Sequence, residues 1–241
     1  MSQSIVAIRR YPVKCMAGED LVRVQLDARG LVGDRWYAVV DGEGHFASGK
    51  RTRRFRRHDE VFAYRASTTG LGVEVATGSR SWMVGDAGLD DHLSNALGEP
   101  VRVMPEAAVP HFDADAVSLV TTGTLRWCES ELGVDADPRR LRSNLVVEAD
   151  EPFIEESWVG RILRVGSATL RMVVRIERCR TIDVHQDGAA AARRWLKPLA
   201  AAREMRVGVY TDVVEGGVVS VGDVVAAVRS TDAMETSDTI A

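Results

Sequence analysis

The stretch Arg35-Trp36-Tyr37-Ala38-Val39-Val40-Asp41-Gly42-Glu43-Gly44-His45-Phe46-Ala47 carries the clearest structural pattern in the sequence. Its first six residues are rich in aromatic and β-branched side chains, and two glycines beside acidic residues follow them. The pattern therefore predicts a strand, a hairpin turn and a second strand. Similar short runs recur at residues 5–8, 22–26, 61–65, 72–75, 118–120, 145–147, 161–165, 169–173, 208–210, 217–219 and 224–228. Strands this short and this frequent predict a mainly β chain with a few helices, built as small barrels or sandwiches.

Three segments predict helices. Residues 90–98 end in a glycine, and Thr121 or Thr122 can cap a second helix that also stops at a glycine, after residue 132. Residues 189–202 are rich in alanine and arginine and predict a third helix, which a proline interrupts.

A connector divides the chain. The segment from about residue 105 to residue 112 shows neither the hydrophobic periodicity of a helix nor that of a strand. It predicts a division into residues 1–104 and residues 105–228. Residues 229–241 are polar and predict a disordered tail.

Composition narrows the class of protein. The 241 residues are 45% hydrophobic and 27% charged, with a net charge of −4, which is typical of a globular protein and not of one that coats nucleic acid. Three scattered cysteines make no disulfide framework, and we find neither a signal peptide nor an apolar stretch long enough for a membrane helix. We therefore expect a protein of the reducing cytoplasm, with neither nucleic acid nor membrane as a partner.

Cys179 is the best candidate for reactive chemistry. It lies between Arg178 and Arg180 after a strand-like run, and nearby positive charge favours the thiolate that attacks electrophiles and binds metals. Asp183 and His185 follow closely and are candidate catalytic partners, although a turn would have to bring the histidine back towards the thiol. The spacing is not that of a usual zinc site. A packed, inert cysteine is the alternative.

Clusters of basic residues suggest anion binding. Six of the nine residues 50–58 are basic, Arg54 among them, which predicts an anion-binding loop or, alternatively, a solvated loop paired with surface carboxylates. Phe55 is the one aromatic residue within it, which disfavours nucleic acid as its ligand. Lys14, after a proline break, and Arg35, at the start of a strand, could clamp an anion from one rim. The alternative, which the residues alone slightly favour, is a surface lysine and an arginine that pairs with Asp34.

A third basic cluster runs from Arg139 to Asn144. If the segment is extended, Arg140, Arg142 and Asn144 share one side of it, where they could contact a ligand or form internal salt bridges. The sequence has no GxSxG elbow, no P-loop and no GxGxxG fingerprint.

Taken in order, these motifs resemble the MOSC family, which is named for the C-terminal domain of molybdenum cofactor sulfurase and includes the mitochondrial amidoxime-reducing components and their bacterial relatives. The resemblance covers about residues 5–228. It rests on Tyr11-Pro12-Val13-Lys14-Cys15-Met16-Ala17-Gly18-Glu19, Gly30-Leu31-Val32-Gly33-Asp34-Arg35-Trp36-Tyr37, Arg140-Leu141-Arg142-Ser143-Asn144, Glu177-Arg178-Cys179 and Val221-Gly222-Asp223. It implies a smaller MOSC N-terminal β-barrel portion and a β-barrel MOSC core.

The resemblance also implies a ligand. Members that bind molybdenum cofactor (molybdopterin) hold it in a basic cleft between the two portions, and the cysteine that matches Cys179 supplies sulfur to the metal. A soft metal needs a thiolate, and a pterin phosphate needs fixed cations and backbone donors. By this resemblance, the expected cofactor-binding residues are those that match cofactor-contacting positions of such members or lie beside them: Lys14, Cys15, Arg35, Arg54, Thr121, Thr122, Arg140, Arg142 and Asn144.

The resemblance implies an oxidoreductase that reduces N-hydroxylated or other N-oxygenated small molecules, with electrons from a separate donor protein. Two alternatives stay open: a metal-free sulfur-transfer or sulfur-substrate enzyme with Cys179 as thiolate or persulfide carrier, and a module that delivers cofactor without turnover. Cys15 stands where relatives often have serine, and Ser143 replaces a common proline. We do not recognise the pyridoxal-phosphate portion of the sulfurases in this chain, so we do not expect the chain to bind pyridoxal phosphate.

Overall fold

A computed structural model describes residues 3–186, 188–189 and 193–228 of the chain. It is mainly β, with several sheets and four α-helices among these residues, which confirms the predicted fold class. The predicted disordered tail, residues 229–241, lies outside the described residues. Within the described part of the chain, no helix is long and apolar enough to cross a membrane.

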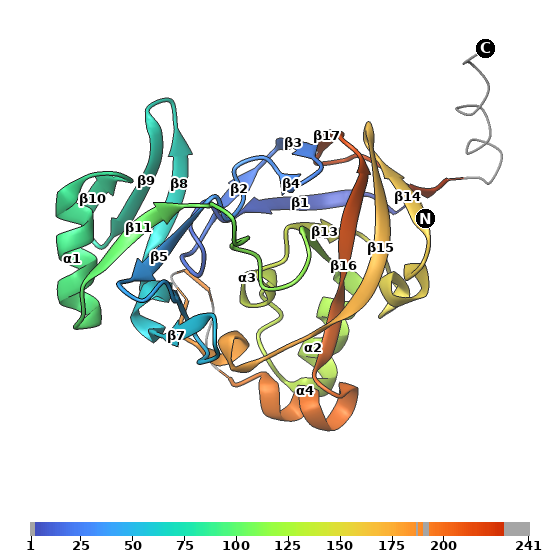
Figure 1. Cartoon of the computed structure of the whole chain (residues 1–241). Helices are drawn as coiled ribbons and strands as arrows, with labels where there is room; N and C mark the ends of the chain where they lie inside the picture. Colours follow the sequence, from blue (N-terminus) through green and yellow to red (C-terminus); the bar gives the residue numbers. More distant parts are fainter. Residues whose placement is uncertain (1–2, 187, 190–192, 229–241) are drawn as a thin grey trace, which may run out of the picture.

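The largest sheet has eight strands and forms the centre of what we call the large lobe, on the right in Figure 1. Its spatial order is β18 (Val225–Ala227), β14 (Ile162–Val165), β15 (Ala168–Glu177), β16 (Arg206–Glu215), β12 (Val117–Thr121), β13 (Leu145–Val147), β1 (Ile5–Arg10) and β2 (Glu19–Leu21). Neighbours are antiparallel except for the parallel pair β12 and β13. A further sheet of β17 (Gly217–Ser220), β3 (Arg23–Asp27) and β4 (Gly30–Leu31) packs against the same apolar core.

Residues 37–105 form the small lobe, on the left in Figure 1. One sheet contains β11 (Val101–Pro105), β5 (Tyr37–Asp41), β6 (Phe46–Ser48) and β7 (Phe55–Arg57), and the other contains β10 (Arg80–Met83), β9 (Gly72–Thr77) and β8 (Arg65–Thr69). The predicted hairpin is confirmed, because Val40 pairs with Phe46 and the Asp41 carboxylate accepts hydrogen bonds from two backbone N–H groups of the turn.

The two ends of the described chain both lie in the large lobe. Residues 5–31 supply β1 to β4, and β1 pairs with β13 from the second half of the chain. The end of β11 at Pro105 coincides with the predicted connector. The division into sequential domains at residue 104 stays a prediction, since the large lobe draws strands from both sides of it.

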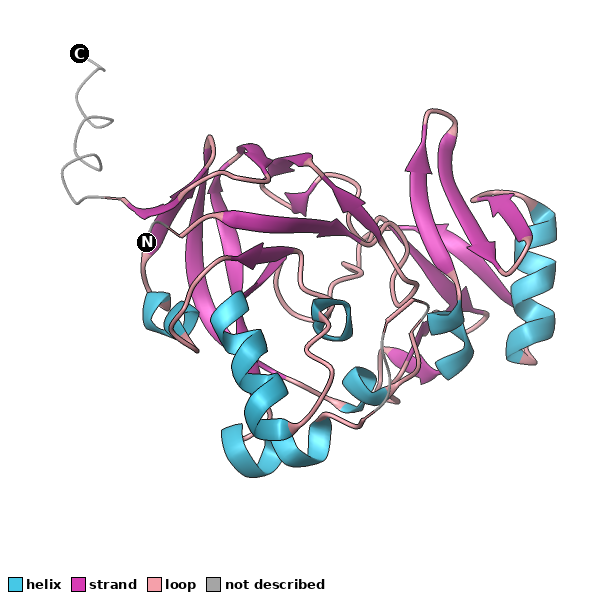
Figure 2. Ribbon diagram, turned by 180° about the vertical axis from the view of Figure 1, so that it is seen from behind, coloured by secondary structure: helices cyan, strands magenta, loops and turns pink. Residues whose placement is uncertain are grey.

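Alternation along the strands builds two apolar layers in the large lobe. In β12, Leu119 faces the core between the sheets, whereas Val120 faces the helices on the other side. That outer layer is covered by α2 (Thr122–Leu132) and α4 (Leu196–Arg203), which lie on the same side of the sheet in Figure 2. The remaining helical elements are α1 (Ala87–Leu97), α3 (Pro138–Leu141), η1 (Asp59–Ala63), η2 (Ile154–Trp158) and η3 (Arg180–Asp183).

Two predicted helices are confirmed and the third differs. Gly98 and Gly133 adopt left-handed conformations and end α1 and α2 as expected. The predicted helix over residues 189–202 is wrong at residues 189 and 193–195, because α4 begins at Leu196, and residues 190–192 lie outside the described residues. Its proline falls in the first turn, where no intrahelical N–H donor is needed, so it starts the helix instead of interrupting it.

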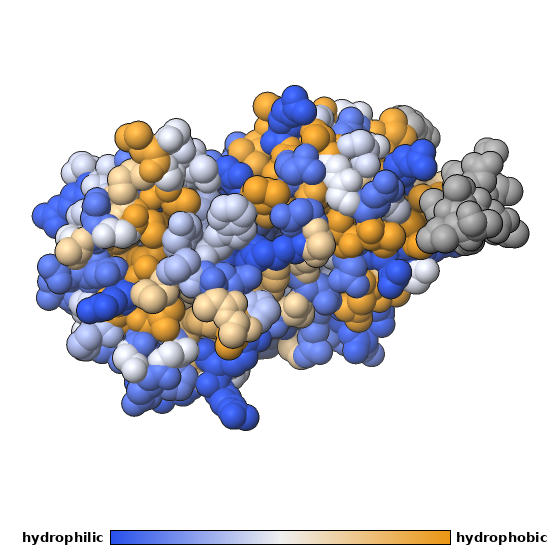
Figure 3. Space-filling view, turned by 45° about the horizontal axis from the view of Figure 1, so that its top comes forward, coloured by the Kyte–Doolittle hydropathy of each residue, from blue (hydrophilic) through white to orange (hydrophobic). Residues whose placement is uncertain are grey.

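The surface mixes polar and apolar residues. On the face in Figure 3, hydrophobic and hydrophilic residues are interspersed over both lobes. The most exposed large hydrophobic residues are Leu71, at 91%, and Val22, at 79%. They belong to different lobes, and exposed hydrophobic residues of this kind are common on protein surfaces.

An ion pair connects the lobes. Asp59 of η1 accepts from Arg180 Nη1 at 2.7 Å, and this hydrogen bond, with help from Arg57, lowers the pKa of the Asp59 carboxyl to about 2. The same arginine donates to the Gly49 carbonyl at 2.7 Å. The turn that follows Cys179 is therefore tied to the small lobe.

We expect Asp59→Asn to lower the free energy of unfolding at pH 6 by about 1 kcal/mol, because the pair is partly exposed and screened by solvent. A carboxylate with a depressed pKa stabilises the fold above its unfolded value of about 4, and the contribution is lost as the pH falls through about 2. Urea unfolding of both proteins between pH 6 and pH 2 should show the difference shrinking to zero. Asp91→Asn, at an exposed carboxylate of α1, is the control. An equal, pH-independent loss in both variants would contradict this assignment.

Candidate functional site

A cavity of about 340 Å³ lies where the two lobes meet. The small lobe and the chain beside it contribute Lys14, Cys15 and Lys50, and the large lobe contributes the end of β15 and Tyr210. The volume is in the usual range for small-molecule and cofactor sites. Of the residues predicted to bind a ligand, the cavity is lined by Lys14, Cys15, Arg35, Arg140, Arg142, Asn144 and Cys179.

Cys179 lies in the cavity wall immediately after β15, at the start of η3. Its Sγ donates to Thr181 Oγ1 at 3.3 Å, and its side chain is half-buried. Gly49 allows the small lobe to approach this turn, since a Cβ there would come within 3.0 Å of Thr181 Oγ1. The thiol is therefore held at the boundary between the lobes, with one side facing the cavity.

The other two cysteines have different surroundings. Cys15 also lines the cavity, but it is buried and adopts a positive φ of 67°. Cys128 is fully buried in the layer between the large sheet and its helices, where burial raises the pKa of its thiol to about 12. Of the three thiols, that of Cys179 is the most accessible to a reagent in solution.

Two lysines share one carboxylate at the cavity. Lys14 donates to the His111 carbonyl at 2.8 Å and forms an ion pair with Asp113, and Lys50 forms an ion pair with the second oxygen of the same carboxylate at 3.0 Å. Although burial opposes it, the charge of the two ammonium groups holds the pKa of Asp113 well below its usual range. The carboxylate is therefore ionised, and it compensates one of the two lysine charges.

Arg35 and Asn144 form the base of the cavity. Arg35 forms an ion pair with the fully buried Asp34, and it donates from Nη1 to Asn144 Oδ1 at 3.1 Å and from Nη2 to the Arg142 carbonyl at 3.2 Å. Its guanidinium and that of Arg142 lie 4.7 Å and 4.2 Å from the centre of the Tyr11 ring. The aromatic ring therefore supports two cations beside each other.

The segment around Arg142 is not extended, although the predicted alternation of Arg140, Arg142 and Asn144 required an extended segment. Residues Pro138–Leu141 form the short helix α3, and Arg142 ends it with a φ of 51°. Arg140 and Arg142 still line the cavity, together with Asn144, but the turn of the backbone brings them there. The three residues do lie together, although the backbone conformation predicted for them was wrong.

Two arginines of the cavity carry surplus donors. Arg142 Nη2 and Arg178 Nη2 are buried and have no hydrogen-bond partner among the described residues. Arg178 donates its other guanidinium protons to the carbonyls of Val207 and Leu141. Burial lowers the pKa of both guanidinium groups, which is the cost of holding positive charge without a compensating anion.

Several predicted site residues do not line the cavity. Thr121 and Thr122 are not among the residues that line the cavity, and their hydroxyl groups donate to Glu155 and to the Ala149 carbonyl. A Cβ on Gly123 would meet three carbonyl oxygens of residues 149–151 at 2.7–2.9 Å, so the chain itself covers this helix start.

The expected catalytic partners of Cys179 also lie elsewhere. Asp183 accepts from the Trp195 N–H at 2.6 Å and supports the start of α4. His185 is exposed and does not line the cavity. Arg54 is exposed too, and its Nη2 donates to the carbonyls of Pro110 and Phe112. It therefore contacts the connector and does not line the cavity.

Residues that sequence reasoning missed are Asp113, Asp115, Ser118 and Tyr210. Burial raises the pKa of the Tyr210 phenol, so it stays a neutral donor beside the cations. None of the four stands in a charge cluster, and only Tyr210 belongs to a recognisable run, Gly208-Val209-Tyr210, which the family resemblance also includes. The connector, β12 and β16 bring these four residues to the cavity when distant parts of the chain pack together.

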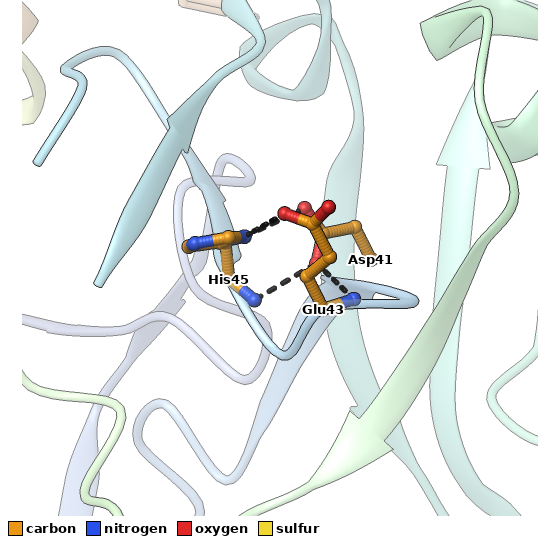
Figure 4. A group of neighbouring side chains, drawn as sticks. All are labelled: Asp41, Glu43 and His45. Carbon is orange, nitrogen blue, oxygen red and sulfur yellow. Dashed lines mark hydrogen bonds and ion pairs between the residues drawn. The ribbon is translucent and has the colours of Figure 1, made fainter. Parts of the chain in front are cut away.

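Figure 4 shows a group outside the cavity with metal-ligand side chains: Asp41, Glu43 and His45. Their oxygens and ring nitrogen already have partners, because Arg56 forms ion pairs with both carboxylates and His45 Nδ1 lies 3.0 Å from Asp41. The guanidinium supplies the positive charge that a metal ion would bring, so the group is a salt-bridge cluster of the hairpin turn.

The chain is similar to several known proteins. It is 26% identical over 262 residues to molybdenum cofactor sulfurase from Danio rerio, covering 83% of this chain and 31% of that protein. It is 32% identical over 98 residues to molybdenum cofactor sulfurase from Oryza sativa subsp. japonica, covering 37% of this chain and 11% of the rice protein. The chain therefore spans less than a third of the length of these relatives.

The fold also has a counterpart among solved structures. The YuaD protein from Bacillus subtilis matches over 94% of this chain and 96% of its own, with a TM-score of 0.50 and 12% sequence identity. Among family models, the MOSC N-terminal beta barrel domain matches residues 2–78 and the MOSC domain matches residues 92–226. Since the second match alone spans more than half of the sequence, the chain belongs to the MOSC family.

Proposed function

We propose that this MOSC protein binds molybdenum cofactor in the cavity between its lobes and reduces N-hydroxylated or other N-oxygenated small molecules, with Cys179 as the protein ligand of molybdenum. The observation that carries the proposal is the combination of a half-buried thiol and uncompensated guanidinium groups in one cavity. Buried positive charge without a compensating anion costs free energy, and a half-buried thiol is reactive. Together these features match a ligand that has an anionic group and a soft metal.

The donor set fits the cofactor. The buried nitrogens Arg142 Nη2 and Arg178 Nη2 have no hydrogen-bond partner in the described part of the chain, so an anion in the cavity would gain from their charge. Because neither nitrogen is exposed to solvent, they act mainly through their field in a region of low dielectric constant. Lys14, Arg35 and Asn144 offer side-chain groups closer to the cavity itself.

Each residue then has a distinct task. Lys14, Arg35, Arg140, Arg142 and Asn144 would hold the pterin and its phosphate, and Cys179 would hold the metal. When bound, the cofactor supplies the redox chemistry. The chain orients it by fixing Cys179 on the turn that Arg180 ties to the small lobe. Three cysteines cannot hold an all-cysteine iron–sulfur cluster, and in this proposal the electrons come from a separate donor protein.

Metal analysis tests this proposal. Protein purified from a host that makes the cofactor should contain about one molybdenum atom per chain, and Cys179→Ala should lower the content at least about tenfold, because the thiolate is the ligand. Cys128→Ala, at the fully buried thiol outside the cavity, should keep the metal. Molybdenum and bound pterin are measured by mass spectrometry and by fluorescence after extraction. Metal-free wild-type protein that still reduces N-hydroxylated compounds would sink the proposal.

A second candidate function follows from the relatives, which are molybdenum cofactor sulfurases. In this alternative, the protein works without metal and Cys179 carries sulfur as a persulfide. The Cys179 thiolate would attack the terminal sulfane sulfur of a polysulfide. One sulfur–sulfur bond of the donor breaks, and the donor leaves one sulfur atom shorter.

Peptide mass spectrometry distinguishes this alternative. After incubation with inorganic polysulfide, the peptide with Cys179 should gain the mass of one sulfur atom, whereas the peptide with Cys128 should not, because its thiol is buried and its pKa is about 12. Dithiothreitol should reverse the change. An unmodified Cys179, with modification of small-molecule thiols in the same sample, would argue against persulfide transfer.

A further inference from the structure

The connector between β11 and β12 is fixed on both sides of Asp113. Arg54 Nη2 donates to the carbonyl groups of Pro110, at 2.6 Å, and Phe112, at 3.2 Å, and the Arg29 guanidinium lies 4.4 Å from the centre of the Phe112 ring. The ring Nδ1 of His111 lies 3.0 Å from the Arg35 carbonyl. These contacts hold the backbone without using the Asp113 carboxylate, so the side chain can move while the connector stays in place.

The Asp113 carboxylate lies between the two lysines of the cavity. One oxygen pairs with Lys14 and the other with Lys50, and it has no further hydrogen-bond partner in the described part of the chain. The side chains of Lys14 and Lys50 are 6% and 26% exposed, whereas that of Asp113 is 38% exposed. The carboxylate therefore has solvent on one side, into which it can turn, and the lysines face the cavity.

An anion that enters the cavity has to compete with this carboxylate. A ligand carboxylate offers the lysines the same single charge that they already have, and it lacks the advantage of being attached to the chain. A phosphate monoester carries a charge between about −1.5 and −2 at pH 7 and has three acceptor oxygens. It can neutralise both ammonium groups, so its binding gains an attraction to the second lysine that a monoanion does not gain.

We propose that Asp113 is a specificity-determining residue: its carboxylate occupies the Lys14–Lys50 pair in the absence of a ligand, and it yields the pair to a dianionic phosphate group but not to a monoanion. The inference deepens the proposed function, since it rests on the cavity being the site of an anionic ligand. The Lys14–Lys50 pair is then the phosphate subsite, and the Asp113 carboxylate competes with the ligand for it.

Asp115 provides a matched control. It lines the same cavity two residues further along the connector, and the described residues include no ion-pair partner for it. Asp115→Asn changes the charge of the cavity wall by the same amount as Asp113→Asn. Only the second substitution frees the two lysines, so general electrostatics and displacement can be separated.

The test compares two probe anions, inorganic phosphate and acetate, by calorimetric titration at pH 7.5 and constant ionic strength. The protein is the full-length chain purified without bound cofactor. The wild type should bind phosphate at least about tenfold more tightly than acetate. Asp113→Asn should increase acetate affinity about tenfold and reduce this ratio, whereas Asp115→Asn should leave the ratio within about twofold of the wild type. Circular dichroism and thermal melting confirm that the variants are folded.

Lys50→Gln keeps the proposal testable if Asp113→Asn does not fold. In this variant, Asp113 and Lys14 form a neutral pair, so most of the preference for phosphate should disappear. The proposal is overturned if the ratio in Asp113→Asn equals that of the wild type, if Asp115→Asn changes it equally, or if Lys50→Gln retains the full preference.

The outcomes separate this inference from the proposed function. If phosphate binds but Asp113→Asn has no effect on the ratio, the competitor role fails while the anion site remains. If phosphate binds to none of these proteins, the lysine pair is not an anion subsite and this inference falls with that premise. The molybdenum content of protein from a cofactor-producing host then decides separately whether the proposed function survives.

Discussion

The buried ion pair of Asp34 and Arg35 is the interaction on which the cavity depends. The Asp34 side chain is fully buried and accepts from the Tyr11 N–H at 2.7 Å, and Arg35 reaches from it to Asn144. Asn144 in turn accepts from the Ser118 N–H at 3.1 Å. Loss of one partner from such a pair leaves a buried charge without compensation, which typically costs about 3–5 kcal/mol. This network joins the segment before Lys14 to the parallel strands β12 and β13.

The cavity formed above this network has more positive charge than the fold compensates. Asp34 balances Arg35 and Asp113 balances one lysine. The guanidinium groups of Arg142 and Arg178 each keep a buried nitrogen that has no partner among the residues the structure describes. Burial disfavours the charged form of both groups, so holding them without a compensating anion costs free energy. The surplus charge is consistent with a fold that reserves part of its electrostatic stabilisation for an anionic ligand, as the proposed cofactor would be.

The sequence predicted the composition of the site better than its geometry. Lys14, Arg35, Arg142 and Cys179 were identified from local charge, from a proline break and from family motifs, and the structure brings all four to one cavity. Those signals survive because they concern residue type and motif order. In contrast, Thr121 and Thr122 were placed at a ligand on the general behaviour of helix starts, and here residues 149–151 cover that start. No local pattern predicts which segment packs against a helix terminus.

The sequence by itself determined the mainly β class, the hairpin after Val40, the glycine ends of α1 and α2, and the family, because alternation, turn chemistry and motif order act over a few residues. Only the tertiary structure decided that Asp113 lies between Lys14 and Lys50, which are 99 and 63 residues away in the chain. It also decided that Asp183 and His185 stay outside the cavity although they follow Cys179 closely. The physical reason is that ion pairing and exposure depend on which distant segments meet, and the packing of the two lobes settles this, not the spacing of residues along the chain.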